Sequence, residues 1–206
     1  GALLQYLYDT QKIDLSHINR LDYYEQDVFM ELDLTARRNL ELTATFRTQE
    51  RRGSLLWVLD KTKTAMGARM LRRFLEQPLI QTEEIRARHD AVQELTDNPM
   101  IRDEIREYLQ PVYDLERLPS RIIYNSANPR DLIAFRNSLE MLPPIRTVLE
   151  NFQKDELSAI REELDPLQDI YQLILQSIEE EPPITIREGG IIKDGFDEDI
   201  DMLRSA

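Results

Sequence analysis

The sequence predicts a mainly all-α protein, a helical bundle with minor short strands. Three observations predict it. Asparagine or aspartate followed by proline recurs where helices should begin, and apolar residues behind these pairs follow a helical spacing. Glycine is scarce, with 6 residues in 206, while hydrophobic residues make up 41% and charged residues 32%. Such a chain has enough apolar material for a core and few of the glycine turns of a β fold.

The Asn/Asp-Pro pairs each predict an N-cap followed by proline at the first helical position. They are Asn98-Pro99, Asn128-Pro129 and Asp165-Pro166. Each precedes an apolar stripe, and the stripes consist of Ile101, Ile105, Tyr108 and Leu109; of Leu132, Ile133, Phe135, Leu139 and Leu142; and of Leu167, Ile170, Tyr171, Ile174 and Ile178. The sequence therefore predicts a helix behind each pair.

The stretch 53–79, GSLLWVLDKTKTAMGARMLRRFLEQPL, predicts another amphipathic helix that Pro78 ends. Its apolar face comprises Met66, Met70, Leu71, Phe74 and Leu75. Thr82 is the expected cap of the next helix, whose stripe comprises Ile85, His89, Val92 and Leu95. His89 on this apolar edge is expected to be a structural residue.

Two segments predict short strands. Residues 28–34, VFMELDL, alternate apolar and polar side chains, and residues 184–196, ITIREGGIIKDGF, combine β-branched residues with glycines as a hairpin would. The final DEDIDMLRSA predicts a helix with an acidic first turn. Its Ile200 and Leu203 are expected to need a continuation, so the chain is expected to be cut there.

Charge is unevenly distributed along this acidic chain, whose formal net charge is -13. From Arg51 to Arg73 there are seven Lys/Arg and one acid, Asp60, whereas residues 150–206 carry 16 Asp/Glu and 5 Lys/Arg, a net of -11. Positive residues near the only tryptophan, Trp57, predict contact with phosphate or with an acidic partner.

The common catalytic and metal-binding motifs are missing from the sequence. It has no Gly-Lys pair, hence no P-loop, and no Gly-x-Gly-x-x-Gly. His17 and His89 are far apart and have no cysteine to complete a zinc site. Residues 194–201, DGFDEDID, lack the residue order of a calcium loop and predict an acidic helix start instead. No pair among the 39 acids stands out as a general acid and base.

The sequence also bears on the compartment of the protein. It has no cysteine, which favours an intracellular protein. Residues 1–10 have neither the basic start nor the apolar centre of a signal peptide. No apolar run approaches the roughly 20 residues that span a bilayer, so no membrane contact is expected.

Three separated motifs, in order, carry a family resemblance. The stretch 53–79, together with ELDLTARRNLEL at 31–42 and IREGGIIKDGFDEDIDMLR at 186–204, resembles the core, or lever, domain of the bacterial MutS family of DNA mismatch repair proteins. LLQYLYDTQK from Leu3 is similar to the family's helix leaving the connector domain. The resemblance covers nearly the whole chain.

The resemblance implies a domain division and a mechanical role. Residues 1–12 would be the helix exiting the connector domain, and residues 13–206 the part of the core domain before the clamp. This domain would couple an ATPase to the mismatch-binding and clamp domains without catalysis of its own. The resemblance implies ATP and Mg for the intact protein and no cofactor in this chain. It also implies a homodimer, mismatched double-stranded DNA bound through other domains, and a cytoplasmic, nucleoid-associated location.

The family's mismatch wedge has a Phe-x-Glu motif, but Phe29-Met30-Glu31 and Phe74-Leu75-Glu76 lack its glycine-led context, so no role is transferred to them. The candidate relay or structural residues are Trp57, Asp60 and Gly67, with Trp57 expected to anchor the segment in the bundle. The candidate contacts to phosphate or to an acidic partner are Lys61, Lys63, Arg69, Arg72 and Arg73. Two alternatives remain open: an independent all-helical adaptor that binds another protein, and a hydrolase with a dispersed carboxylate site.

Overall fold

The computed structural model describes residues 2–11 and 29–205, and it confirms a mainly helical fold. The helices in chain order are α1 (Ala2–Gln11), α2 (Leu34–Asn39), α3 (Leu55–Leu59), α4 (Ala65–Glu76), α5 (Thr82–Asp97), α6 (Pro99–Leu109), α7 (Leu118–Ile123), α8 (Pro129–Glu140), α9 (Leu142–Leu149), α10 (Asp155–Glu163), α11 (Gln168–Ser177), the 3₁₀ helix η2 (Ile186–Glu188) and α12 (Glu198–Ser205).

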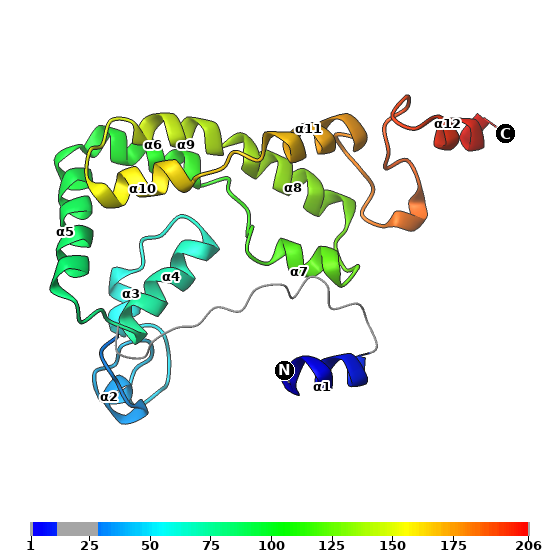
Figure 1. Ribbon diagram of the computed structural model, residues 1–206. Helices are drawn as coiled ribbons and strands as arrows, with labels where there is room; N and C mark the ends of the chain where they lie inside the picture. The colour runs from blue at the N-terminus through cyan, green and yellow to red at the C-terminus, as the bar shows by residue number, and fades with distance from the viewer. Residues whose placement is uncertain (1, 12–28, 206) are drawn as a thin grey trace.

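Helices α5 to α11 form one connected body, called the framework below. Helix α5 packs on α6 and α10, helix α9 packs on α6, α8 and α10, and α11 runs against α8. Figure 1 shows α5 leading from the level of α3 and α4 up to the layer of α6, α9 and α10, with α8 and α11 continuing that layer. Helices α3 and α4 pack on each other below it.

The framework has a buried apolar core where α5, α9 and α10 meet. Phe152, between α9 and α10, is 1% exposed and forms one buried cluster with Ala91, Ile145, Leu149 and Leu157. Residues of α6 and the ends of α5 and α9 cover this cluster from outside. The helices have apolar faces and are joined by short connections, so α5, α6, α9 and α10 pack around the Phe152 ring.

Glu94 fastens α5 to the start of α10. Its carboxylate accepts hydrogen bonds from the backbone N–H groups of Gln153 (2.9 Å) and Lys154 (3.1 Å). Because N–H groups at a helix start have no partner within the helix, a carboxylate from another helix can satisfy them. This contact therefore joins α5 to the start of α10.

Two of the expected helix starts match the structure. Helix α6 begins at Pro99, although the Asn98 side chain donates to Glu94 O instead of capping. Helix α8 begins at Pro129 with a full capping box, in which Asn128 Oδ1 accepts from Asp131 N at 2.9 Å and Asp131 accepts from Asn128 N at 2.8 Å.

Other helix boundaries differ from the prediction. Helix α11 begins at Gln168, because Asp165 accepts from Leu167 N in a local turn and Leu167 adopts a left-handed φ of 48°. Thr82 is the first residue of α5 and Gln81 precedes it as N-cap without a side-chain bond. The stripe ending at Leu142 spans two helices, since α8 ends at Glu140.

In place of the two predicted strand segments, the described residues form isolated β-bridges. Phe29 pairs with Leu79, and Met30 N donates to Pro78 O at 2.7 Å, but Leu34 already starts α2; Val28 lies outside the described residues. In the second segment Ile192 pairs with Ile178, while Ile186–Glu188 form η2. Gly189 and Gly190 both have positive φ, which turns the chain before a hairpin ladder can form.

Within the described part of the chain, none of the helices has the length and apolar character needed to cross a membrane. Residues 13–28 of the expected core domain, among them His17, lie outside the described residues. Helix α1 lies within the expected segment 1–12, and the assignment of that segment to the exit from a connector domain stays a prediction.

Candidate functional site

The basic segment 51–77 begins with a short helix held by one buried side chain. Ser54 is fully buried and its Oγ accepts from Trp57 N at 3.3 Å, which caps α3. Leu56 is 5% exposed, and its N–H donates to Leu42 O at 2.8 Å. Leu56 is therefore the residue that anchors α3.

The expectation that Trp57 anchors this segment by burial is wrong in this chain. Trp57 is 47% exposed, and Val58 (55%) and Leu59 (47%) beside it are similarly open. The reason is geometric: α3 has five residues and packs along one side on α4, so most of its positions point elsewhere. Trp57 lies on an outward apolar surface instead.

Asp60 and Gly67 shape the turn between α3 and α4. Asp60 accepts from the Thr62 hydroxyl (2.6 Å) and the Thr62 N–H (3.1 Å), and it pairs with Arg51. The Thr62 hydroxyl, more than Arg51, holds the pKa of Asp60 below its ordinary value. Thr64 Oγ1 caps α4 by accepting from Gly67 N at 3.0 Å, and a Cβ on Gly67 would lie 3.1 Å from that oxygen. Glycine at 67 thus permits the tight capping turn.

The five cationic candidates do not form one patch. Lys61 and Lys63 are exposed. Arg72 pairs with Glu76 at 2.9 Å and Arg73 bonds to Gln77 at 3.2 Å, both within or at the end of α4. Arg69 alone among the five reaches a distant part of the described chain with its side chain.

Arg69 is bound by two acids about 45 residues away. Its guanidinium donates to both Asp114 oxygens, at 2.8 and 2.6 Å, and to Glu116. These hydrogen bonds, first the one to Asp114, raise the pKa of Arg69. The same bond with Arg69 is the largest cause that lowers the pKa of Asp114, and Arg117 adds to it. A planar guanidinium matches a carboxylate in this two-bond geometry.

The lowered Asp114 pKa predicts a specific acid sensitivity. A carboxyl group whose pKa is lower in the folded state stabilises the fold above its unfolded value of 3.8, and this stabilisation is lost as pH falls through the lower folded value. Asp114→Asn should therefore lose less stability than the wild type between pH 5 and pH 3, measured as the shift in urea midpoint. Asp103→Asn, an exposed carboxylate of α6, should keep the wild-type loss. Identical pH profiles for Asp114→Asn and the wild type would refute the assignment.

Sequence reasoning missed an ion pair that joins the buried Arg136 of α8 to Glu180, after α11. The Arg136 side chain is 10% exposed and donates to both Glu180 oxygens at 2.8 Å, which raises the pKa of Arg136 and lowers that of Glu180. Lys193 joins Glu180 at 3.4 Å and donates to Leu175 O at 2.9 Å. The signal in the sequence that could have predicted this pair is an arginine, Arg136, within the apolar stripe of α8, because a buried arginine is usually paired with an acid. The network ties the glycine-containing loop to α8 and α11.

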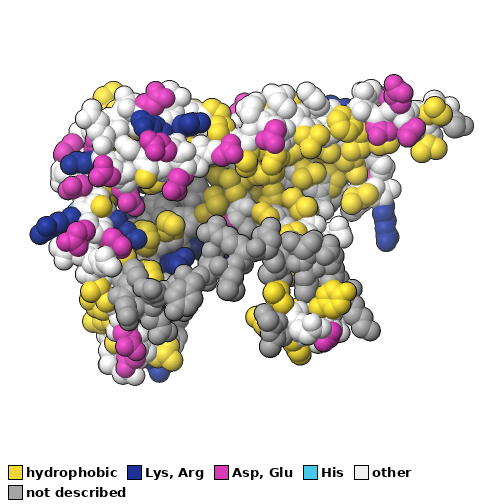
Figure 2. All heavy atoms as spheres, in the orientation of Figure 1, with side chains coloured by type: hydrophobic (Ala, Val, Ile, Leu, Met, Phe, Trp, Pro, Cys, Tyr) yellow, Lys and Arg dark blue, Asp and Glu magenta, His cyan; other side chains and the backbone are white. Residues whose placement is uncertain are grey.

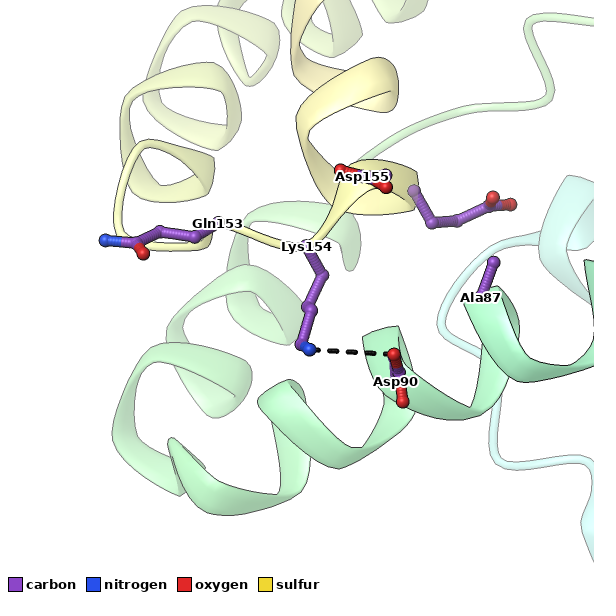
Figure 3. A pocket seen from close by; sticks show the side chains of 6 residues that line it. Ala87, Asp90, Gln153, Lys154 and Asp155 are labelled. Carbon is purple, nitrogen blue, oxygen red and sulfur yellow. Dashed lines mark ion pairs between the residues drawn. The ribbon is translucent and has the colours of Figure 1, made fainter. Parts of the chain in front are cut away.

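A shallow pocket of about 270 Å³ lies between α5 and the start of α10. Figure 3 shows Lys154 reaching toward Asp90, at 3.5 Å, with Ala87, Gln153 and Asp155 around them. Both partners of this pair are more than half exposed, and such pairs contribute little. Asp155 stands in the first turn of α10, where the helix dipole favours an acid. The lining is thus explained by helix capping.

His89 does not have the structural role expected of it. It is exposed, and with Phe74, Leu79 and Arg88 it lines a shallow depression of about 290 Å³. Arg88 lies over the Phe74 ring, 4.0 Å from its centroid. Within residues 2–11 and 29–205, no group of three or more His, Asp or Glu is placed to hold a metal ion.

The visible surface combines mixed charge with an apolar area. Figure 2 shows acidic and basic side chains interspersed over α5, α6 and α10, and apolar side chains gathered over α8 and α11. The charged residues described above connect helices and turns of the chain to one another. The geometry defines a helical structural domain in which ion pairs link distant segments.

Comparison with known proteins gives the family. The chain belongs to the family described as MutS domain III, whose model matches residues 35–204. It is 59% identical over all 206 residues to the DNA mismatch repair protein MutS of Lachnoclostridium phytofermentans and covers 22% of that protein. It is 50% identical over 206 residues to the DNA mismatch repair protein MutS of Acetivibrio thermocellus, covering 24% of it. The chain thus spans less than a quarter of the length of these relatives.

Proposed function

We propose that this chain is a non-catalytic mechanical link within a MutS-type DNA mismatch repair protein. It couples an ATPase domain to the domains that hold mismatched DNA, and both lie elsewhere in the polypeptide. The ATP and Mg of the intact protein bind outside this chain, mismatched duplex DNA contacts other domains, and the intact protein is a cytoplasmic, nucleoid-associated homodimer. Residues 1–12 lead out of the connector domain, and residues 13–206 form the part of the core domain before the clamp.

The observation that carries the proposal is the way the basic segment is used. Arg69 of α4 is bound inside the chain by Asp114 and Glu116, while Trp57 of α3 is 47% exposed. A link between distant sites needs rigid elements with defined contacts at both ends. The Phe152 core supplies rigidity, and the exposed apolar side of α3 offers a surface for a neighbouring domain of the same protein.

This arrangement assigns separate roles to the candidate residues. Trp57 contacts another domain, and Asp60 and Gly67 keep α3 and α4 in a fixed relation through the turn between them. Arg69 contacts an acidic neighbour within the core domain. Lys61, Lys63, Arg72 and Arg73 are left for an acidic partner or for weak phosphate contact.

The isolated chain should show neither ATP turnover nor mismatch recognition. No sequence element can hold a triphosphate, so purified protein should not hydrolyse ATP with magnesium. Any DNA binding should be weak, equal for matched and mismatched duplexes, and lost steeply with salt, measured by fluorescence anisotropy. Replacing Lys61 and Lys63 with Gln should lower the salt slope by up to about 1.8, at ~0.9 for each phosphate that a lysine no longer neutralises.

The two parts of this test fail in different ways. ATP hydrolysis that persists through purification would contradict a non-catalytic link. A mismatch preference that survives high salt would mean that recognition lies in this chain. Arg69→Gln, which removes one positive charge where the lysine pair removes two, serves as the control for DNA binding, because Asp114 and Glu116 bind that side chain.

A further inference from the structure

Residues 29–77, called the α2–α4 unit below, enter and leave the fold at one place. Phe29 pairs with Leu79 in an antiparallel bridge, and Met30 N donates to Pro78 O at 2.7 Å. Residues 77–81 between α4 and α5 are not helical. The unit is therefore joined to α5 through a narrow neck, and non-helical connections of this kind can absorb the backbone rotation of a hinge.

The unit contributes little to the buried core of the framework. The Phe152 cluster and the residues packed on it all come from positions 91–164. Helix α4 has an apolar stripe but no buried residue. Apolar burial is what usually holds two packed bodies together, and little of it joins the unit to the framework. Among the described residues, other contacts must therefore hold the unit in place.

Polar contacts hold the far end of the unit. Arg69 binds Asp114 and Glu116 in the segment between α6 and α7, and Arg106 of α6 donates to Lys61 O at 3.2 Å. Arg69 lies eight residues before Gln77, which places it on the order of 12 Å along α4 from the neck. The Arg88–Phe74 contact lies close to the neck instead.

The hydrogen bonds of Arg69 to Asp114 and Glu116 are short, but solvent reaches all three side chains. The side chains of Arg69, Asp114 and Glu116 are 34%, 18% and 65% exposed, so water and salt reach them. Partly solvated ion pairs are screened by salt and contribute modest free energy. A carboxylate or phosphate from another domain could take Arg69 without the cost of breaking an apolar core.

We propose that Arg69 with Asp114 and Glu116 is a releasable latch, which holds the α2–α4 unit against the framework and lets it rotate about the neck when opened. Opening moves the Trp57 surface relative to the Phe152 core. The part of the latch in coupling ATP to DNA rests on the proposed function, whereas its opening is a property of this chain alone.

Spin labels can detect the opening in the 206-residue chain. The chain has no cysteine, so Ala65→Cys on α4 and Gln110→Cys beside α6, both exposed, give one labelled pair. Pulsed electron resonance should give one narrow distance at ~0.01 M salt, where the Debye length is ~30 Å, and a second population at ~1 M. Position 65 lies about 18 Å along α4 from the neck, so a rotation of about 30° shifts that distance by on the order of 9 Å.

Arg69→Ala should show the second population at both salt concentrations. Arg72→Ala is the matched control, because Arg72 pairs with Glu76 of its own helix and should behave as wild type. Glu116→Gln removes an exposed partner without altering α4, and it should open the latch at lower salt than the wild type. Circular dichroism verifies that each variant is folded.

A single unchanged distance in folded Arg69→Ala and Glu116→Gln would overturn the latch. If Arg69→Ala unfolds, Glu116→Gln alone decides, because its outcome does not depend on α4. A latch that opens here while ATP-triggered DNA release in the intact variant stays normal would refute the coupling role and leave the latch standing. An unchanged distance together with impaired release would refute the latch and leave a coupling role for these residues.

Discussion

Phe152→Ala is expected to lower the free energy of unfolding by about 3–5 kcal/mol. Phe152 is 1% exposed and belongs to one buried cluster with Ala91, Ile145, Leu149 and Leu157, so its removal leaves a cavity where α5, α9 and α10 meet. The surrounding helices are tied to each other by the Glu94 contact to α10 and relax only in part. Urea unfolding followed by far-ultraviolet circular dichroism measures the change.

Phe46→Ala is the matched control for this loss. Phe46 is 53% exposed and Arg38 lies 5.7 Å from its ring centroid, so its truncation should cost less than about 1 kcal/mol. The urea slope should stay near that of the wild type in both variants if only stability changes. Equal losses at 46 and 152 would mean that the Phe152 cluster is not the core of the domain.

Local signals explain which helix boundaries could be predicted from the sequence. Asn128-Pro129 predicts the start of α8 because the cap, the proline and the reciprocal Asp131 bond all lie within four residues. The same signal fails at Asp165-Pro166, where the aspartate bonds to Leu167 N and that residue turns left-handed before α11. An Asn or Asp before proline can accept a hydrogen bond either as a helix cap or in a local turn. Contacts beyond the Asn/Asp-Pro pair decide which of the two forms.

The charge pattern predicted that the basic segment contacts phosphate or an acidic partner, but it could not identify the acidic residues. Arg69 and Asp114 are 45 residues apart, and their meeting depends on the path through α5 and α6. The burial of Leu56 in place of Trp57 is likewise a tertiary result. Both residues belong to one apolar run, and the packing of α3 leaves Leu56 5% exposed but Trp57 47% exposed.

Trp57→Ala should leave the isolated chain folded while it impairs the intact protein. With 47% of the residue exposed, the substitution should cost the chain less than about 1 kcal/mol, far below the cost of truncating a buried aromatic. Leu56→Ala, at the buried neighbour, should cost about 2–5 kcal/mol and serves as the control for loss of the anchor itself.

In the intact protein, ATP-triggered release from a mismatch should slow by at least about fivefold in Trp57→Ala, the lower end of typical coupling between sites. The reason is that Trp57 lies on the outward side of α3, where a neighbouring domain would sense the position of the α2–α4 unit. ATP hydrolysis and mismatch affinity, each measured alone, should stay near normal, since the proposed function places both sites outside this chain. Trp57→Phe, which keeps an aromatic ring, should show a smaller effect. If release is unchanged, or if basal ATP hydrolysis falls as far as release does, Trp57 is an ordinary surface residue and the coupling path runs elsewhere.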